Sequence, residues 1–190
     1  MLFSERNNQF IDAMGLIENI SNSLKTVSWI WGGFTTDIYI GRILREHDDL
    51  DYLTLNLHQL KPMFEEAFSS NDWQCENLCN GDMKLRKDNL KVHLGNVELD
   101  NGLVKWTHNG EKGSLLFPVP WLNPNIVGFL EAELHVVAPE LQYVLKEHPE
   151  LLNPDWIIRE KDIVEKKYLQ DLLVKEKINV CSLCKLIISI

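Results

Sequence analysis

The chain has 190 residues, of which 45% are hydrophobic and 25% are charged. This length predicts one domain, or one domain with an extension, and this composition is typical of a soluble globular protein. The formal net charge of −9 argues against DNA or RNA as a partner, because binding a polyanion requires a basic surface.

Membrane segments are not expected either. The apolar runs are all shorter than the roughly 18 residues that a spanning helix needs, including the closing run over 186–190. The start of the chain over 1–8 is polar and is not followed by the apolar stretch of a secretion signal. We therefore expect a cytoplasmic protein that has no membrane partner.

The first part of the chain alternates between helical and extended patterns. Apolar residues at helical spacing follow Ser4, a suitable N-cap, and the short apolar run before Gly32 and Gly33 is typical of a strand that ends in a tight turn. Leu50 and Tyr52 then alternate with polar residues, as in a strand with one buried face. The elements expected here are a helix over 4–25, a strand over 27–31, a helix over 34–44, a strand over 49–57 and a helix over 58–69.

The middle of the chain changes to shorter, strand-like segments. Asn80-Gly81 and Asn101-Gly102 are strong signals for hairpin turns, and the stretch over 109–124 is rich in Gly and Pro, as loops are. Helical patterns return near the end of the chain. The elements expected here are strands over 73–78, 83–86, 90–97, 103–106 and 134–137, and helices over 139–147 and 156–175.

This order of elements predicts an α+β fold, with a small mixed sheet that has helices on one face and a C-terminal helical extension. The Pro-rich stretch over 118–124 is a plausible boundary. We therefore expect a core over 1–120 and a mostly helical part over 121–190 that packs on it.

A pair of carboxylates downstream of the Gly-Gly turn is the strongest functional signal. Asp49 and Asp51 are two apart, so a strand would project both side chains to one face. Two such oxygen ligands suit a Mg²⁺ ion that bridges nucleotide phosphates. The turn at Gly32-Gly33, which opens a helix, offers backbone N–H groups to phosphate oxygens. Together these features indicate nucleotidyl transfer.

These residues resemble the DNA polymerase β-type nucleotidyltransferase superfamily, and within it the lincosamide and aminoglycoside adenylyltransferases. The resemblance covers most of residues 8–173 and implies a nucleotidyltransferase fold. Its specific part consists of Gly32, Gly33, Asp37, Gly41, Arg45, His47, Asp49 and Asp51.

The resemblance also implies roles for these residues. Asp49 and Asp51 would be the catalytic pair that holds Mg²⁺, and Gly32 and Gly33 would cradle the phosphates of a nucleoside triphosphate. The other residues that the resemblance assigns to the nucleotide are Arg45, Lys146 and Lys161.

Position 91 departs from the family pattern. A strand of the family carries Asp-x-His, where the aspartate is a metal ligand or the base for the acceptor hydroxyl. This chain has Lys91 and His93 there. Three interpretations remain open. Lys91 neutralises the carboxylate pair and disables the metal site, another acid such as Glu98 or Asp100 serves instead, or the metal strand lies elsewhere.

Four residues are expected at or near the cleft, each with a structural alternative. Lys91 and His93 share a strand face and would line the cleft. His47 has the alternative of a hydrogen-bonded structural role. Asp37 falls in a first helical turn, where an ion pair with Arg45 is the simpler interpretation.

The four cysteines provide a weaker hypothesis. Cys181 and Cys184 have the spacing of zinc ligands, and Cys75 and Cys79 would complete a four-sulfur site. Reduced, buried thiols are the preferred interpretation.

The sequence thus predicts a Mg²⁺-dependent transfer of AMP, or of another nucleoside monophosphate, from ATP to a hydroxyl of a small molecule. Resistance to an antibiotic is what the relatives suggest. The alternative is a catalytically degenerate protein of the same fold that binds a nucleotide or a protein partner, and Lys91 is the feature that favours it.

Overall fold

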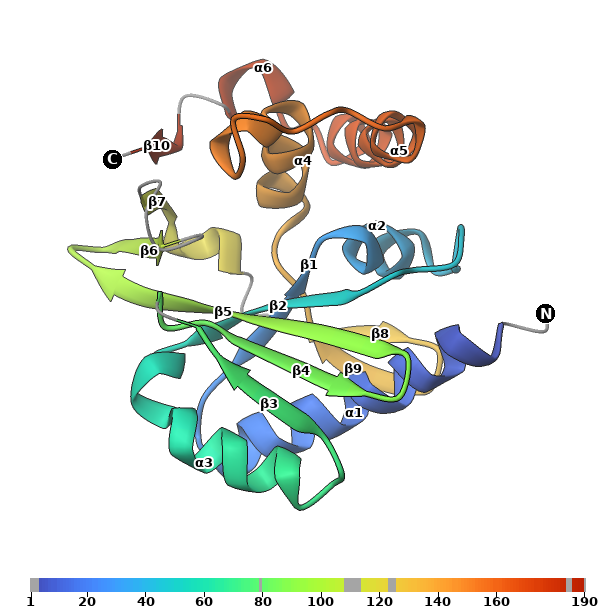
Figure 1. The fold of residues 1–190 in the computed structure, drawn as a ribbon. Coiled ribbons are helices and arrows are strands. Elements are labelled where there is room, and N and C mark those ends of the chain that lie inside the picture. The colour runs from blue at the N-terminus through green and yellow to red at the C-terminus, as the bar shows by residue number, and fades with distance from the viewer. Residues whose placement is uncertain (1–3, 79, 108–113, 123–125, 184–185, 190) are drawn as a thin grey trace.

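The computed structural model describes residues 4–78, 80–107, 114–122, 126–183 and 186–189 (Figure 1). Within these residues, eight strands form one mixed sheet. Strand β5 is the longest and lies at its centre. It pairs in parallel with β2 along one edge, while β4 and then β6 pair antiparallel along its other edge. The strands are β1 (Ser28–Trp31), β2 (Leu50–Leu55), β3 (Gln74–Asn77), β4 (Met83–Lys87), β5 (Leu90–Asp100), β6 (Leu103–Thr107), β7 (Ser114–Pro118) and β10 (Ile188–Ser189).

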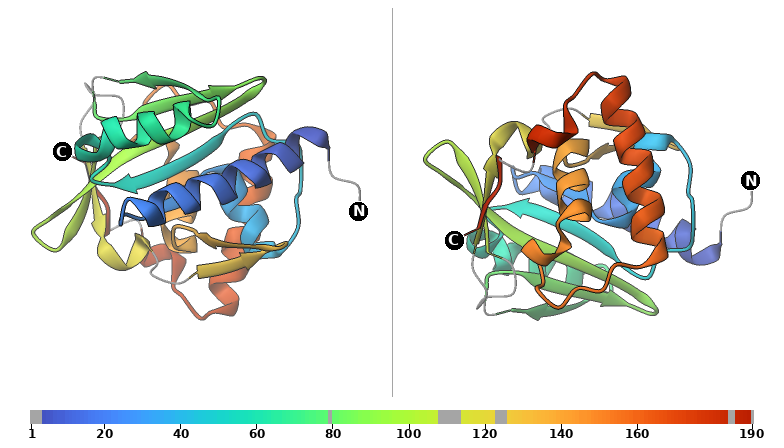
Figure 2. Two further views of the ribbon diagram at one scale, coloured as in Figure 1. Left: turned by 90° about the horizontal axis from the view of Figure 1, so that it is seen from below. Right: turned by 90° about the horizontal axis from the view of Figure 1, so that it is seen from above.

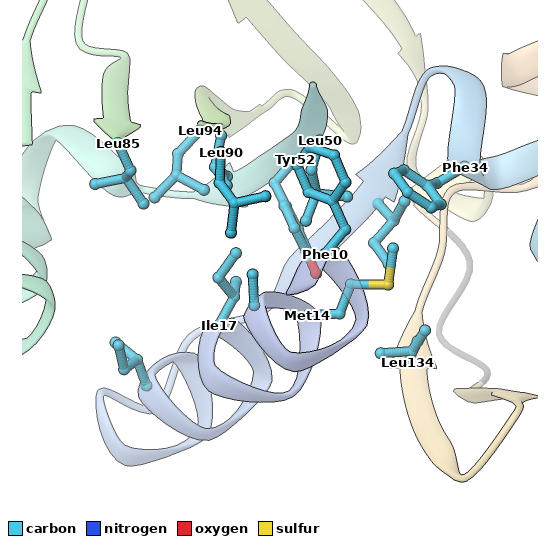
Figure 3. Packing of buried hydrophobic residues seen from close by; sticks show 14 of the residues in the cluster. Phe10, Met14, Ile17, Phe34, Leu50, Tyr52, Leu85, Leu90, Leu94 and Leu134 are labelled. Atoms are coloured by element: carbon cyan, nitrogen blue, oxygen red, sulfur yellow. The ribbon is translucent and has the colours of Figure 1, made fainter. Parts of the chain in front are cut away.

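One face of the sheet is covered by α1 (Glu5–Ser23) and α3 (Leu57–Ser69) (Figure 1). The hydroxyl of Ser4 accepts a hydrogen bond from the backbone N–H of Asn7, which confirms the predicted N-cap. Phe10 and Met14 of α1 are fully buried and point toward Tyr52 of β2 (Figure 3). Burial of this apolar face fixes which side of β2 points away from the core.

The opposite face carries the second core. Helices α4 (Pro139–Glu147), α5 (Glu160–Lys175) and α6 (Val180–Leu183) lie on this side (Figures 1 and 2). Leu53, the neighbour of Tyr52 on β2, faces this core together with Trp106, Leu141 and Leu169. Helices therefore flank the sheet on both faces, which confirms the predicted α+β fold with a mixed sheet and a C-terminal helical extension, although the first set of helices was expected on one face only.

Two differences from the expected elements have local causes. Helix α2 (Gly33–Ile40) ends before residue 44, because Gly41 takes a left-handed conformation with φ of 72° and caps it. Helix α5 begins at Glu160 and not at 156. Its capping box joins Arg159 and Asp162.

The Gly- and Pro-rich stretch over 109–124 also contains structure that the sequence did not predict. Strand β7 and the 3₁₀ turn η1 (Val119–Leu122) lie within it. A two-stranded sheet follows, in which β8 (Ile126–Phe129) was not predicted and β9 (Ala132–His135) overlaps the strand expected over 134–137. A short 3₁₀ turn, η2 (Pro149–Leu151), follows α4. Leu134 of β9 belongs to the first core, whereas α4 and α5 belong to the second. The division at residue 120 remains a prediction.

The cysteine hypothesis concerns a part of the chain that is mostly not described. Cys79 and Cys184 lie outside the described residues. Cys75 on β3 is half-buried and has a free thiol. In the described ranges, no helix combines the length and apolar character needed to cross a bilayer.

Candidate active site

The Gly-Gly turn joins β1 to α2 and is crowded on both sides. Gly32 has φ of 79°, a conformation that favours glycine. A Cβ atom on Gly32 would lie 2.8 Å from Oδ2 of Asp51, and one on Gly33 would lie 2.5 Å from Nη2 of Arg45 and 2.8 Å from Nδ1 of His47. All three distances are shorter than van der Waals contact allows. The two glycines therefore let a carboxylate and a guanidinium approach the backbone at the start of a helix.

The two carboxylates stand at the start of β2. Asp51 is its second residue and pairs with Trp31 of β1 and His93 of β5. Asp49 directly precedes the strand and is exposed, while the side chain of Asp51 is 23% exposed. Burial, reinforced by the charge of Asp49, raises the pKa of Asp51 to about 7, although His93 opposes the shift. Two acidic groups are thus held together against their mutual repulsion.

This donor set fits a magnesium ion that is shared with a substrate. Across the described part of the chain, no group of three or more His, Cys, Asp and Glu side chains is arranged to hold a metal. Magnesium usually needs no such group, because one or two carboxylates together with phosphate oxygens and water complete its six ligands. Asp49 and Asp51 both line the cleft together with the turn, and Asp51 lies directly beside Gly32. They supply what such a site requires from the protein.

Basic residues from three segments meet the turn and the carboxylates in one cleft. Arg45 comes from the loop before β2, Lys146 from α4, and Lys161 from the first turn of α5. Arg159 lies over the ring of Trp156, 4.8 Å from its centroid, and both line the same cleft. We define the cleft by the functional residues that line it, which are Gly32, Gly33, Arg45, Asp49, Asp51, Gln142, Lys146, Trp156, Arg159 and Lys161.

Buried acids of α5 hold two of these cations in place. Nε of Arg45 donates to Oε1 of Glu165 at 2.9 Å, and Nζ of Lys146 lies 2.6 Å from Oε2 of the same carboxylate. Lys146 also donates to Oδ1 of Asp162 at 2.8 Å. The side chains of Glu165 and Asp162 are 3% and 4% exposed, so the pairs are shielded from water. The network fixes α5 to α4 and to the loop before β2.

Asp162 is the acid most strongly affected by this network. Burial alone would raise its pKa, but hydrogen bonds from Arg159 and Lys146 outweigh burial and hold the pKa of Asp162 well below its usual range. The carboxylate therefore stays ionised and fixes the direction of both cations.

Gln142 of α4 is a residue of the cleft that the sequence did not reveal. Its Oε1 accepts a hydrogen bond from the N–H of Gly32 at 3.0 Å, and its Nε2 donates to the carbonyl of Gly32 at 2.8 Å. Gln142 is buried. Its only sequence signal is its place one helical turn before Lys146, on the same face of α4. It holds the turn against the helix that carries a cleft cation.

The structure places Asp37 and His47 beneath the turn, and the residues that line the cleft do not include them. Nε2 of His47 lies 2.7 Å from Oδ2 of Asp37, and both side chains are buried. Burial raises the pKa of Asp37, although the hydrogen bond with His47 opposes the shift. The predicted ion pair between Asp37 and Arg45 is wrong. Asp37 pairs with His47, and Arg45 pairs with Glu165. The pair supports the turn from below, because His47 also stacks on Phe34 of α2.

Lys91 and His93 lie beside the carboxylate pair on β5. Lys91 is exposed, and among the described residues it makes no ion pair with Asp49 or Asp51. Nε2 of His93 lies 3.1 Å from Oδ2 of Asp82, and its Nδ1 lies 3.9 Å from Oδ1 of Asp51. Asp82 is fully buried and was also missed by the sequence, in which it simply follows a hairpin turn.

The two acids proposed as replacements for the missing carboxylate lie away from the cleft. Glu98 and Asp100 belong to the end of β5 that pairs with β6. Glu98 lies 3.3 Å from Nδ1 of His58, at the start of α3. The residues that line the cleft include neither acid. Neither acid therefore supplies a third carboxylate to the cleft, and Lys91 remains the residue that the resemblance aligns with that position.

Comparison with known proteins agrees with this arrangement. The model of the aminoglycoside-2''-adenylyltransferase family matches residues 14–145. No curated protein sequence matches the chain. A solution structure of the antibiotic-resistance factor ANT(2'')-Ia is 18% identical, with a TM-score of 0.66, over 92% of this chain and 90% of that one. A crystal structure of the same protein in complex with adenylyl-2''-tobramycin is 16% identical, with a TM-score of 0.69, over 93% of this chain and 95% of that one. The lincosamide adenylyltransferase LnuA, bound to lincomycin, is 17% identical, with a TM-score of 0.62, over 90% of this chain and 98% of that one. These similarities show a nucleotidyltransferase fold.

Proposed function

The chain belongs to the aminoglycoside-2''-adenylyltransferase family, and we propose that it transfers AMP from ATP, or another nucleoside monophosphate from its triphosphate, to a hydroxyl of a small molecule. One observation carries the proposal. The Gly32-Gly33 turn, the Asp49–Asp51 pair and the basic residues of α4 and α5 come from distant parts of the sequence and line a single cleft. We call it the nucleotide cleft from here on.

Each group in the cleft has a role that follows from its chemistry. The N–H groups at the start of α2 face phosphate oxygens, since a helix N-terminus favours negative charge. Arg45, Lys146 and Lys161 balance the charge of the β- and γ-phosphates. Asp49 and Asp51 would hold Mg²⁺, which when bound supplies charge neutralisation at the phosphates.

The reaction itself is an in-line displacement at the α-phosphorus. The acceptor oxygen forms a bond to that phosphorus while the bond to the leaving pyrophosphate breaks, and the proton of the acceptor hydroxyl passes to water. The protein acts by holding both partners in line and by stabilising the leaving charge. Because Arg45 and Lys146 are already fixed by Glu165, little reorganisation is needed when the triphosphate binds.

Support for a small acceptor comes from the relatives. The structures named above include one protein bound to lincomycin and one in complex with adenylyl-2''-tobramycin. Both acceptors are small hydroxylated antibiotics. The net charge of −9 argues against a nucleic-acid acceptor. The use of ATP favours a cytoplasmic location, which we include in the proposal.

A degenerate member of the fold is the second candidate. Lys91 stands on the strand next to Asp49, where the family carries a carboxylate, and an ammonium group cannot ligate a metal. Such a protein would bind a nucleotide or a protein partner without turnover.

Titration calorimetry of ATP, with and without Mg²⁺, tests the nucleotide site. We expect Mg²⁺-dependent binding by the wild type and its loss in Asp49→Ala/Asp51→Ala. The matched control is Asp12→Ala/Asp171→Ala, which removes two exposed acids that do not line the cleft and should bind like the wild type. Mg²⁺-dependent binding that persists without Asp49 and Asp51 would contradict the proposed site.

An assay of AMP transfer separates the two candidates. Purified protein is incubated with labelled ATP, Mg²⁺ and a panel of hydroxylated acceptors that carry positive, negative or no charge. Labelled product and stoichiometric pyrophosphate support an enzyme. ATP binding without any product across the panel supports the degenerate alternative.

A further inference from the structure

A row of charged side chains crosses the exposed face of the sheet, starting from the catalytic pair. Asp51 on β2 pairs with His93 on β5, and His93 pairs with Lys84 on β4. Residues that are paired across strands project to the same face. Their neighbours in sequence, such as Leu85 and Leu94, are buried in the first core on the opposite face. The polar row therefore points toward the side of the sheet on which the nucleotide cleft opens.

A second row runs beside the first. Leu50 pairs with Val92, so Asp49, one residue earlier, lies next to Lys91. Lys91 in turn pairs with Arg86 on β4. Together the two rows place three basic side chains next to the carboxylate pair. We define the cation ladder as Lys84, Arg86 and Lys91, which line one hollow with His93, Asp49 and Asp51.

The cation ladder lies on the side of the carboxylate pair that an acceptor must use. The turn and the cations of α4 and α5 occupy the nucleotide cleft on the other side of the pair. In an in-line displacement the acceptor oxygen approaches opposite to the leaving pyrophosphate. The hollow with the ladder is therefore the acceptor side. Lys84, Arg86 and Lys91 are exposed, so this side is reached from solvent.

The charges of this hollow are unbalanced once the metal site is filled. Lys84, Arg86 and Lys91 are all exposed, and in the described ranges none of them has an ion-pair partner within 4.0 Å. The acids that line the hollow are Asp49 and Asp51, and the charge of Mg²⁺ would neutralise this pair. Another acid nearby is Glu76 of β3, which pairs with Lys84 of β4. Arg86 and Lys91 also line a neighbouring hollow, and the acids of that hollow are Glu5, Glu46 and Asp88.

Three free cations in a protein of net charge −9 need a reason. Like charges that lie close together repel one another, and a bound anion would relieve the repulsion among the three cations. We propose that the acceptor is a small hydroxylated anion, bearing a phosphate or carboxylate group, and that the cation ladder binds that group. This inference rests on the proposed function. It assigns to Lys91 a role in acceptor binding in place of the missing carboxylate.

The inference also predicts which acceptors are rejected. An aminoglycoside such as tobramycin carries several ammonium groups at neutral pH, and the ladder would repel them. Specificity of this kind arises from repulsion of the wrong partner as much as from attraction of the right one.

Binding of four matched sugars tests the charge preference. Glucose 6-phosphate, gluconate, glucose and glucosamine share a hydroxylated carbon skeleton but differ in charge. Each is titrated into protein saturated with Mg²⁺ and a non-hydrolysable ATP analogue, and binding is followed by ligand-observed NMR. We expect at least one of the two anions to bind about tenfold or more tightly than glucose and glucosamine. Whichever anion binds better identifies the group that the ladder prefers, and equal or absent binding of all four sugars overturns the inference.

Variants show whether the ladder is responsible. Lys84→Gln/Arg86→Gln should lose the preference for the anions. The control Lys167→Gln/Lys175→Gln removes the same charge from exposed positions of α5 outside the hollow and should keep it. Retention of the preference in the ladder variant would contradict the assignment.

Two further ligands complete the test. Tobramycin should not bind the wild type under the same conditions, and micromolar binding would overturn the inference. Binding of a short single-stranded RNA in place of the sugars would also overturn it, because a polymeric acceptor would then occupy the ladder. ATP binding is measured separately in the wild type and in every variant. A variant that loses anion binding but still binds ATP is altered on the acceptor side alone. Absence of ATP binding by the wild type would instead contradict the proposed function.

Discussion

The two sides of the Asp49–Asp51 pair hold their cations in opposite ways. In the nucleotide cleft, Arg45 and Lys146 are tied to buried carboxylates of α5 at 2.6–2.9 Å. On the ladder side, Lys84, Arg86 and Lys91 extend from β4 and β5 into solvent. Fixed cations suit a ligand whose charged groups are always the same, such as a triphosphate. The exposed cations have no buried partner to hold them, so they do not contribute to the stability of the fold.

The strongest test of this contrast is removal of Glu165, which contacts two cations at once. Glu165→Ala should lower the free energy of unfolding by about 3–5 kcal/mol, because it leaves Arg45 without its buried partner and Lys146 with Asp162 alone. Urea denaturation followed by circular dichroism measures the change. Asp171→Ala, an exposed position of the same helix, should change it by less than about 0.5 kcal/mol. Equal stabilities for the two variants would show that the network is not buried as described.

Asp162 provides a test by pH. Its pKa is lowered in the folded protein, so it contributes stability above its unfolded pKa of about 4, and this contribution is lost as pH falls below that value. The wild type should therefore lose stability between about pH 5 and pH 2. Asp162→Asn should be less stable by about 2 kcal/mol at pH 7, since it weakens hydrogen bonds to charged groups, and its stability should depend less on pH over this range. An unchanged pH profile would contradict the assigned role.

Gln142 connects the nucleotide cleft to the fold. Gln142→Ala should lower the free energy of unfolding by about 1–3 kcal/mol, because both backbone groups of Gly32 lose their partner. It should also weaken ATP binding, since the turn is no longer held. Gln170→Ala, exposed on α5, is the control. A loss of stability with unchanged ATP affinity would mean that Gln142 supports the helix packing but not the turn.

The contrast between local and distant contacts also explains what the sequence revealed. The Gly-Gly turn and the alternation of Asp51 with Leu50 and Tyr52 are local patterns, and they predicted both the strand face and the turn. The partners that organise the cleft are distant. Gln142 lies 110 residues from Gly32, and Glu165 lies 120 residues from Arg45.

The missed elements have a similar cause. Strand β7 contains the alternating buried residues Leu115 and Phe117, but it lies in a stretch whose Gly and Pro residues favour loops. Its pairing with β6 and β10 stabilises a strand that local preference does not predict. Helix α4, by contrast, begins and ends as predicted, since Pro139 opens it and its apolar residues have helical spacing.

The smallest effect on stability is expected at the ladder, in Lys91→Asp. Lys91 is exposed and makes no ion pair with the catalytic carboxylates among the described residues, so the substitution should change the free energy of unfolding by less than about 0.5 kcal/mol in the presence of Mg²⁺. Its effect on binding should be larger. An aspartate beside Asp49 adds a third oxygen ligand, so Mg²⁺-dependent ATP binding should tighten, by roughly tenfold if the added carboxylate contributes about 1.4 kcal/mol. At the same time the preference for anionic acceptors should fall.

Calorimetry with ATP and the sugar titrations measure both changes in one variant, and Lys91→Met serves as the control that removes the positive charge without adding a ligand. Tighter metal binding by Lys91→Asp with an unchanged anion preference would assign Lys91 to the metal site alone, whereas unchanged metal binding in both variants would place it outside that site.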